Sequence, residues 1–488
     1  MRIDWHLKPA TLGGLLLVLL YTVFYLRDPA APGAQLDPCC VTGWIGWGDQ
    51  GFYYRSARAL AAGNFDPGQH WYPLGYALLG APFVFLRNHA FFFVDLASLL
   101  GAYAAFIVFA GRIRVSAFAA VLIFLLTSCA DPVLFRQWVI PWNTTPTAAA
   151  IWALLAVSAA YLQGERHPFL LGILAAAVPI IRPTDGIISV ICLGWVGIET
   201  LRRRQSAIRD GAAMAAGILL LILPYAALHL RIYGPNATTY MINSRYLGFT
   251  LHNPLFRAYI LLIEPRQWYF AGQGLMRHMP WLLFGFAGMA VAWRRGSALA
   301  LLSVCLAAYF ALYLSYVDLL PTGLWRYLNV HYFKWTWAGF GLVGWLLVRD
   351  LFARRREAWV ALAAVFLLSC IRVVPRLADP AEPAVAVDLR GAAATEANTT
   401  MDPTLAVQDS AGLLRSIATM RAFPLPEGAG VRLIAVRRDF VGTVTWAPGH
   451  ELPMLDDQPP QSRWAEQIGF GFPCWLAPRF CKTPALLR

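Results

Sequence analysis

Long apolar segments constrain the fold of this chain more than any other feature of its sequence. Several of these runs reach about 16 to 22 residues, which is long enough for a helix to cross a bilayer. Of the 488 residues, 58% are hydrophobic and only 14% are charged, whereas soluble domains carry about 25% charged residues. The sequence therefore predicts a polytopic integral membrane protein built from helices, which satisfy their own backbone hydrogen bonds in lipid.

Eleven segments are expected to span the membrane. Leu74–Leu86 is not counted, because this run is short and interrupted by Pro82, and we expect a juxtamembrane or re-entrant helix there. A secretory signal peptide is an alternative interpretation of the first segment, since Ala30-Ala31-Pro32 follows a short apolar core. The expected spans are Thr11–Leu26, Ala90–Ala110, Val115–Cys129, Thr145–Leu162, Phe169–Ile181, Gly186–Ile198, Ala212–Leu230, Trp281–Trp293, Ala298–Val317, Trp335–Val348 and Trp359–Val373.

The basic residues predict the orientation of these spans. The net charge is +13, and only three of the 40 basic residues are lysines. Many arginines form short clusters between apolar runs, as expected of cytoplasmic loops, so the charge does not indicate nucleic acid as a partner. Placing the clusters inside leaves the N-terminus in the cytoplasm and the C-terminus outside the cytoplasmic (inner) membrane. The clusters are Arg112/Arg114, Arg166, Arg202–Arg204, Arg294-Arg295 and Arg354–Arg356.

Two parts of the chain follow from this topology. Residues 1–374 are expected to form an all-α transmembrane domain, and residues 375–488 a small extracytoplasmic α/β region with a strand-like run at Val431–Val436. The eight cysteines show no metal-binding spacing, so no metal or other cofactor is predicted; Cys474 and Cys481 would be able to form a disulfide outside the cytoplasm. The expected external segments are 27–73, 131–143, 231–280 and 318–332.

Asp49 is the first candidate for chemistry. It stands at the head of an amphipathic run in the first external segment, between Trp47 and Phe52. Aromatic residues gather at the membrane interface, and partial burial there raises the pKa of a carboxyl towards the range of a general base. The alternative is that Asp49 only caps the helix that follows.

Further candidates lie in the same external segments. His70 and Tyr72 precede a Pro73-Leu74-Gly75 turn, and His70 is either a substrate contact or a hydrogen-bonded surface group. Asp131 is a second possible catalytic carboxylate and Arg136 a possible phosphate contact; a helix-end Asp-Pro turn with an ion pair explains both equally well.

Cations near the outer membrane surface are the third group. Arg182 and Asp185 interrupt two short apolar runs, and an arginine at this depth usually faces a cavity or an anion such as a phosphate group. Asp185 would alternatively only neutralise Arg182. The remaining substrate-binding candidates are Arg58, Arg326, Tyr327 and Lys334, with a snorkelling anchor as the alternative for Arg326.

Together these motifs resemble the GT-C superfamily of membrane glycosyltransferases, in particular protein O-mannosyltransferases and lipid A aminoarabinose transferases. The resemblance rests on Gly48-Asp49, Tyr72-Pro73-Leu74, Arg182-Pro183 and Arg326-Tyr327. It implies an external site where Asp49 deprotonates an acceptor hydroxyl and arginines stabilise the polyprenyl phosphate leaving a monosaccharide donor. Lipid, glycan and protein remain open as acceptors.

Two other function classes are kept open. A lipid-linked glycan or solute transporter would show paired halves with interrupted helices, which the sequence lacks. An O-antigen polymerase or ligase would use a long external loop, for which residues 231–280 are available, but it would leave Asp49 without a purpose.

Overall fold

The computed structural model describes most of residues 7–370 and several short strands beyond them. The described residues are 7–28, 31, 44, 48–202, 207–241, 258, 261–262, 275–316, 329–370, 385–388, 396–398, 404–408, 414–418, 423–424, 432–435, 445–446 and 450–451. The chain divides into a first unit, Met1–Tyr246, Trp281–Phe310 and Val330–Ala364, and a second unit, Leu247–Pro280, Ala311–Asn329 and Val365–Arg488. The predicted domain boundary at residue 374 lies outside the described residues.

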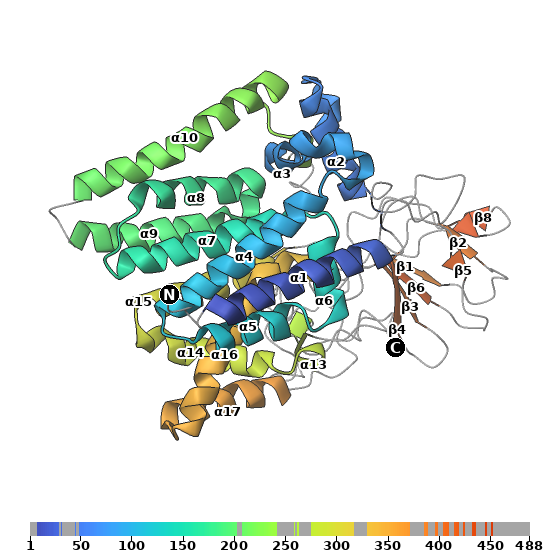
Figure 1. Ribbon diagram of the computed structural model, residues 1–488. Coiled ribbons are helices and arrows are strands. Elements are labelled where there is room, and N and C mark those ends of the chain that lie inside the picture. The colour runs from blue at the N-terminus through green and yellow to red at the C-terminus, as the bar shows by residue number, and fades with distance from the viewer. Residues whose placement is uncertain are drawn as a thin grey trace, which may run out of the picture. The chain divides into compact units, whose positions relative to one another are not determined.

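Each of the eleven predicted spans coincides with one helix (Figure 1). These helices are α1 (Leu7–Arg27), α4 (Phe92–Arg112), α5 (Ala117–Ser128), α7 (Thr144–Leu162), α8 (Pro168–Ile181), α9 (Gly186–Arg202), α10 (Ala207–Tyr233), α14 (Leu282–Ala292), α15 (Ser297–Leu314), α16 (Lys334–Phe352) and α17 (Arg356–Cys370).

Six of the described helices are long and apolar enough to cross a membrane individually: α1, α4, α7, α9 with its preceding turn, α10 and α15. A seventh crossing results if α5 and the following α6 (Pro132–Val139), bent by 92°, count as one span. The all-α polytopic architecture is therefore confirmed, while the number of eleven crossings stays a prediction.

Short helices connect the spans of the first unit. Leu74–Leu86 contains two of them, α3 and the beginning of η3, in agreement with a segment too short to cross. The connecting helices are α2 (Gly48–Ala61), η2 (Pro67–Gln69), α3 (Leu74–Gly80), η3 (Ala81–His89), η4 (Pro183–Asp185), η6 (Trp293–Arg295) and η8 (Asn329–Phe333). A further short helix, α13, covers Leu275–His278.

Glycines allow neighbouring helices of the first unit to approach closely. A Cβ atom on Gly172 of α8 would lie 2.1 Å from the carbonyl oxygen of Met214 in α10. A Cβ on Gly288 of α14 would lie 2.3 Å from the carbonyl oxygen of Val343 in α16. Such contacts are typical of membrane helices, where small residues let backbones pack together.

The described residues after Cys370 are β-strands arranged in two antiparallel sheets. One has the strand order β1-β6-β3-β4 and the other β5-β2-β7-β8. The strand-like run at Val431–Val436 is confirmed, since it contains β6. The strands are β1 (Val385–Asp388), β2 (Glu396–Asn398), β3 (Thr404–Gln408), β4 (Leu414–Ala418), β5 (Phe423–Pro424), β6 (Arg432–Ala435), β7 (Thr445–Trp446) and β8 (His450–Glu451).

Candidate functional site

Asp49 lies in the first turn of α2 and is partly buried. The helix begins at Gly48, so Asp49 is inside the first turn, whereas the capping interpretation placed it before the helix. The hydroxyl of Tyr72 donates a hydrogen bond to its Oδ1. Burial raises the pKa of the Asp49 carboxyl above its ordinary value, and the bond from Tyr72 lowers it in part. The result is a carboxylate prepared to accept a proton.

Aromatic rings cluster around Tyr72, the partner of this carboxylate. Phe52 and Trp71 stack with their centroids 5.1 Å apart and their planes 16° apart. The Tyr72 ring lies 4.8 Å from Tyr53 and also 4.8 Å from Tyr240. Burial and the charge of Asp49 raise the pKa of the Tyr72 hydroxyl, so it remains a donor at neutral pH.

Arg58 lies on the same helix, α2, but its side chain is exposed. Its guanidinium carbon is 5.8 Å from the ring centroid of Tyr54, a distance at which a cation–π contact stabilises an exposed side chain only modestly. Arg58 is therefore available to an anionic group approaching α2 from solvent.

His70 connects the turn that carries Tyr72 to the rest of the first external segment through hydrogen bonds. The ring is fully buried, its Nδ1 is 2.8 Å from the Ser56 hydroxyl, and its Nε2 is 3.0 Å from the carbonyl oxygen of Asn64. A neutral ring that accepts from Ser56 and donates to Asn64 satisfies both contacts. Burial lowers the pKa of His70, while the Asn64 bond and Asp66 raise it. These contacts favour a structural role over contact with a substrate.

Asp131 and Arg136 have protein partners of their own. Asp131 caps α6, because its Oδ1 accepts hydrogen bonds from the backbone nitrogens of Val133 at 2.7 Å and Leu134 at 3.3 Å. Arg136 binds the buried carboxylate of Asp28 through two nitrogens, with Nη2 3.0 Å from Oδ1. The structure places neither residue in contact with Asp49, and both match the turn-and-ion-pair alternative.

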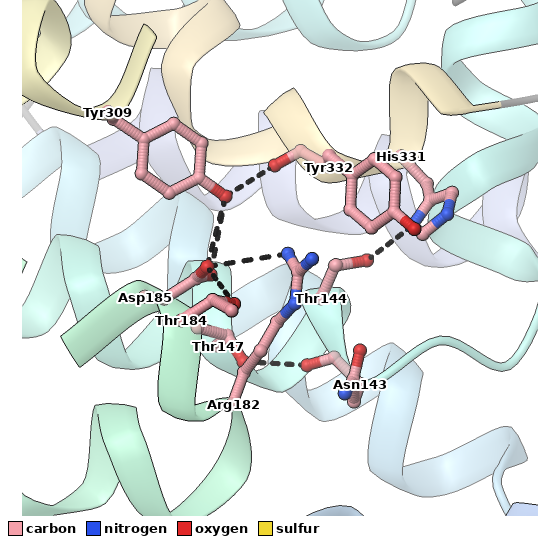
Figure 2. A network of polar contacts seen from close by, with 9 residues as sticks. All are labelled: Asn143, Thr144, Thr147, Arg182, Thr184, Asp185, Tyr309, His331 and Tyr332. Carbon is pink, nitrogen blue, oxygen red and sulfur yellow. Dashed lines mark hydrogen bonds and ion pairs between the residues drawn. The ribbon is translucent and has the colours of Figure 1, made fainter. Parts of the chain in front are cut away.

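Arg182 belongs to a buried polar network at the end of α8 (Figure 2). Its Nη1 is 3.4 Å from Oδ1 of Asp185, and its guanidinium carbon is 4.6 Å from the ring centroid of Tyr332. The hydroxyl of Tyr309 donates to the carbonyl oxygen of Tyr332 at 2.6 Å and lies 3.3 Å from both oxygens of Asp185.

A histidine and a lysine extend this network. His331 lies 3.4 Å from the hydroxyl of Thr144 through Nδ1, and its ring stacks on Trp142 at 3.9 Å. Lys334, at the start of α16, is buried and donates to the hydroxyl of Thr145 at 2.5 Å. Both residues interact electrostatically with Arg182. Burial and the nearby cations Lys334 and Arg182 lower the pKa of His331, so its ring is neutral at neutral pH.

A buried carboxylate balances part of this charge. Asp95, in the first turn of α4, accepts hydrogen bonds from the hydroxyl of Tyr76 at 2.8 and 3.0 Å and interacts electrostatically with Lys334. The Tyr76 ring in turn packs edge-on against Tyr53, with the centroids 5.0 Å apart. A chain of contacts thus connects the ring beside Tyr72 to the network of Arg182 and Lys334.

Gly75 brings the turn of Tyr72 against the end of α8. A Cβ at Gly75 would lie 2.2 Å from the carbonyl oxygen of Ile180 and 2.7 Å from Cα of Ile181. Because Arg182 directly follows Ile181, the motif that contacts Asp49 and the motif that carries Arg182 are adjacent in space. The sequence placed these motifs more than a hundred residues apart and gave no sign of this contact.

Asp95 and His331 were not among the sequence candidates. Asp95 is an acidic residue inside an apolar run, which is itself a sign of function. Arg326 and Tyr327 lie outside the described residues. Within the described part of the chain, no three His, Cys, Asp or Glu side chains lie together as metal ligands would.

Comparison with known proteins gives solved structures with a similar fold, two of which are described below. No family model matches the chain, and no curated protein sequence matches it. ArnT from Cupriavidus metallidurans, bound to undecaprenyl phosphate, is 14% identical with a TM-score of 0.41, and the match covers 73% of this chain and 62% of that one. The oligosaccharyltransferase of Archaeoglobus fulgidus, in the apo form, is 13% identical with a TM-score of 0.40, over 75% of this chain and 54% of that one. The chain thus matches less than two thirds of the length of either protein.

Proposed function

We propose that the protein transfers a monosaccharide from a polyprenyl-phosphate-linked donor to an acceptor hydroxyl at the outer face of the cytoplasmic membrane. The single observation that carries this proposal is the desolvated carboxylate of Asp49, which accepts a hydrogen bond from Tyr72. The turn that carries Tyr72 packs against the end of α8, directly before Arg182. The base is suited to take the proton of the acceptor hydroxyl, and the cationic network on the adjacent backbone segment is suited to stabilise the negative charge of the leaving phosphate.

The base acts on the acceptor. Asp49 takes the proton of the acceptor hydroxyl, the oxygen attacks the anomeric carbon, and the bond between that carbon and the phosphate oxygen breaks. Tyr72 donates to Oδ1, which leaves Oδ2 for the incoming hydroxyl. The raised pKa of Asp49 makes its carboxylate a stronger base than an exposed aspartate. The stacked rings of Phe52 and Trp71 offer an apolar face to a sugar.

The cations act on the leaving group. The electron pair of the broken bond stays on the polyprenyl phosphate, and positive groups fixed where this charge develops lower the barrier. Arg182 and Lys334 are the proposed contacts, because both are buried and already ordered by protein partners. Asp185 and Tyr309 orient Arg182 before the donor arrives.

The test is transfer of a labelled monosaccharide from polyprenyl-phosphate donors by the purified full chain. Asp49→Asn keeps the size of the side chain and a hydrogen-bond acceptor but removes the base, and we expect a loss of about 100-fold or more in transfer rate. The matched control is Asp66→Asn. Asp66 lies in the same external segment and caps η2, a role that asparagine also performs.

Three outcomes separate the alternatives. Loss in Asp49→Asn with full activity in Asp66→Asn supports the transferase. Full activity in Asp49→Asn with loss in Asp131→Asn would move the base to Asp131. Absence of transfer and of polyprenyl phosphate binding in the wild type would favour a transporter. Since the sequence carries no metal-binding spacing, we also expect transfer to persist in EDTA.

A further inference from the structure

A cavity lies at the opposite end of the helices that build the candidate site. Its volume is about 390 Å³, within the range of roughly 300 to 1,000 Å³ typical of small-molecule sites. It is lined by the end of α4, the end of α7 and the first turn of α15, all within the first unit. Asp95 and Arg112 are 17 residues apart on α4, so at 1.5 Å per residue about 26 Å separates Asp95 from this cavity, close to the thickness of the hydrocarbon core.

The lining of this cavity is strongly basic. Arg112, Arg114 and Arg295 line it, and no acidic residue is among the described residues that do. Arg112 is paired with Glu165 and Arg295 with Asp350, so two of the three guanidinium groups are held in place from outside the lining. These pairs fix the two arginines and offset their charges, so Arg114 supplies the net positive charge of the lining.

Backbone amides add to this potential. Ser297, Ala298 and Leu299 form the first turn of α15 and line the cavity. The first N–H groups of a helix have no partner within the helix and carry its partial positive charge. Amides and guanidinium groups around one cavity form the arrangement that binds phosphate oxygens.

Arg114 has an unfavourable backbone conformation for its residue type. It follows the end of α4 with φ of 62°, in the left-handed region, where the residue after a helix is usually glycine. Arg87 and Arg354 also have a positive φ, so this conformation is a local cost that glycine at position 114 would relieve and not in itself a sign of binding.

We propose that this cavity binds a phosphate group on the membrane side that the sequence predicts to be cytoplasmic. The ligand chemistry is a phosphate mono- or diester or free phosphate, with Arg114, Arg112 and Arg295 as the contacts. Two sources share this chemistry: the headgroup of an anionic phospholipid of the inner leaflet and a soluble phosphate.

The experiment is native mass spectrometry of the full chain released from a neutral detergent. One arm titrates short-chain phosphatidylglycerol, a second titrates inorganic phosphate, and diacylglycerol without phosphate serves as the ligand control. The variants are Arg114→Gln and, as the matched control, Arg294→Gln. Arg294 is an exposed residue of η6 that lies outside the lining, so this control removes the same charge. We expect Arg114→Gln to weaken the phosphate-bearing adduct about tenfold or more and Arg294→Gln to leave it unchanged.

The arm in which this pattern occurs identifies the source. Binding of phosphatidylglycerol alone supports the headgroup, and binding of inorganic phosphate supports a soluble ligand. Equal weakening by both variants, or no effect of either, would show that the arginines are general loop charge and would overturn the proposal. Arg114→Gly guards against misfolding, since glycine suits this backbone: we expect a higher thermal midpoint than the wild type together with loss of the adduct. An adduct retained in Arg114→Gly contradicts the assignment of Arg114.

Discussion

Replacing Gly75 with alanine tests how the two parts of the candidate site are held together. The added Cβ would lie 2.2 Å from the carbonyl oxygen of Ile180, 2.6 Å from its carbonyl carbon and 2.7 Å from Cα of Ile181. All three are backbone atoms, so no side-chain rotation relieves the contact. To reach 3.4 Å, where ordinary contact begins, the first turn of α3 must move about 1.2 Å away from the end of α8. Overpacking of this kind costs about 1–3 kcal/mol of stability.

The same displacement alters the site. Tyr72, which contacts Asp49, moves relative to Arg182, and a misplacement of about 1 Å costs on the order of 100-fold in rate. We therefore expect Gly75→Ala to remain folded, with a lower thermal midpoint, and to transfer sugar about 100-fold more slowly. The assay is single-turnover transfer from a polyprenyl-phosphate donor, with the thermal midpoint measured on the same sample.

Two alanine variants serve as controls. Gly101→Ala places its Cβ 3.6 Å from the nearest side chain, an ordinary contact, and should leave both measurements unchanged. Gly172→Ala places its Cβ 2.1 Å from the carbonyl oxygen of Met214, at the other end of α8 from Arg182. It should lower the thermal midpoint as Gly75→Ala does but retain most of the rate. A wild-type rate in Gly75→Ala, or an equal loss in Gly172→Ala, would refute the reasoning.

Three further predictions concern single side chains. Tyr72→Phe removes a hydrogen bond that lowers the pKa of Asp49, so the acidic limb of the pH–rate profile should move to higher pH, as measured by kcat/KM against pH. Arg182→Gln should raise the donor KM about tenfold or more, whereas Arg136→Gln should mainly lower the thermal midpoint, and steady-state kinetics of both variants distinguish these effects. His70→Ala should cost about 1–3 kcal/mol of stability with little change in rate per folded molecule. Because burial lowers the pKa of His70, its contribution to stability is present above the ordinary histidine pKa and is lost as the pH falls through the lowered value; unfolding of wild type and variant between neutral and acidic pH measures this.

The helices of the chain were predictable because a membrane helix corresponds to one continuous apolar segment of the sequence. All eleven predicted spans coincide with helices, and the run interrupted by Pro82 forms two short ones. Of the aromatic residues that flank Asp49 in the sequence, Phe52 stacks on Trp71, whereas Trp47 lies outside the described residues. In each case the signal is local, within one or two turns of the residue concerned.

The contacts that define the site were not predictable from one sequence. Arg136 pairs with Asp28, 108 residues away in the sequence. Trp152 donates to the carbonyl oxygen of Trp335, 183 residues away. Periodicity and composition indicate which face of a helix is buried but not which partner it meets. The close approach at Gly75 depends on the same long-range packing, as does the pairing of the C-terminal strands.

The bond between Tyr76 and Asp95 has a consequence for the order in which this protein is made. Lys334, which balances the Asp95 carboxylate electrostatically, is synthesised about 240 residues after it. At a synthesis rate of about 5–20 residues per second, tens of seconds pass between the synthesis of α4 and that of Lys334. Tyr76 precedes Asp95 by 19 residues and already supplies a hydroxyl to its carboxylate. Removal of this hydroxyl should therefore first appear as poor membrane insertion of the nascent chain, before any effect on the finished protein.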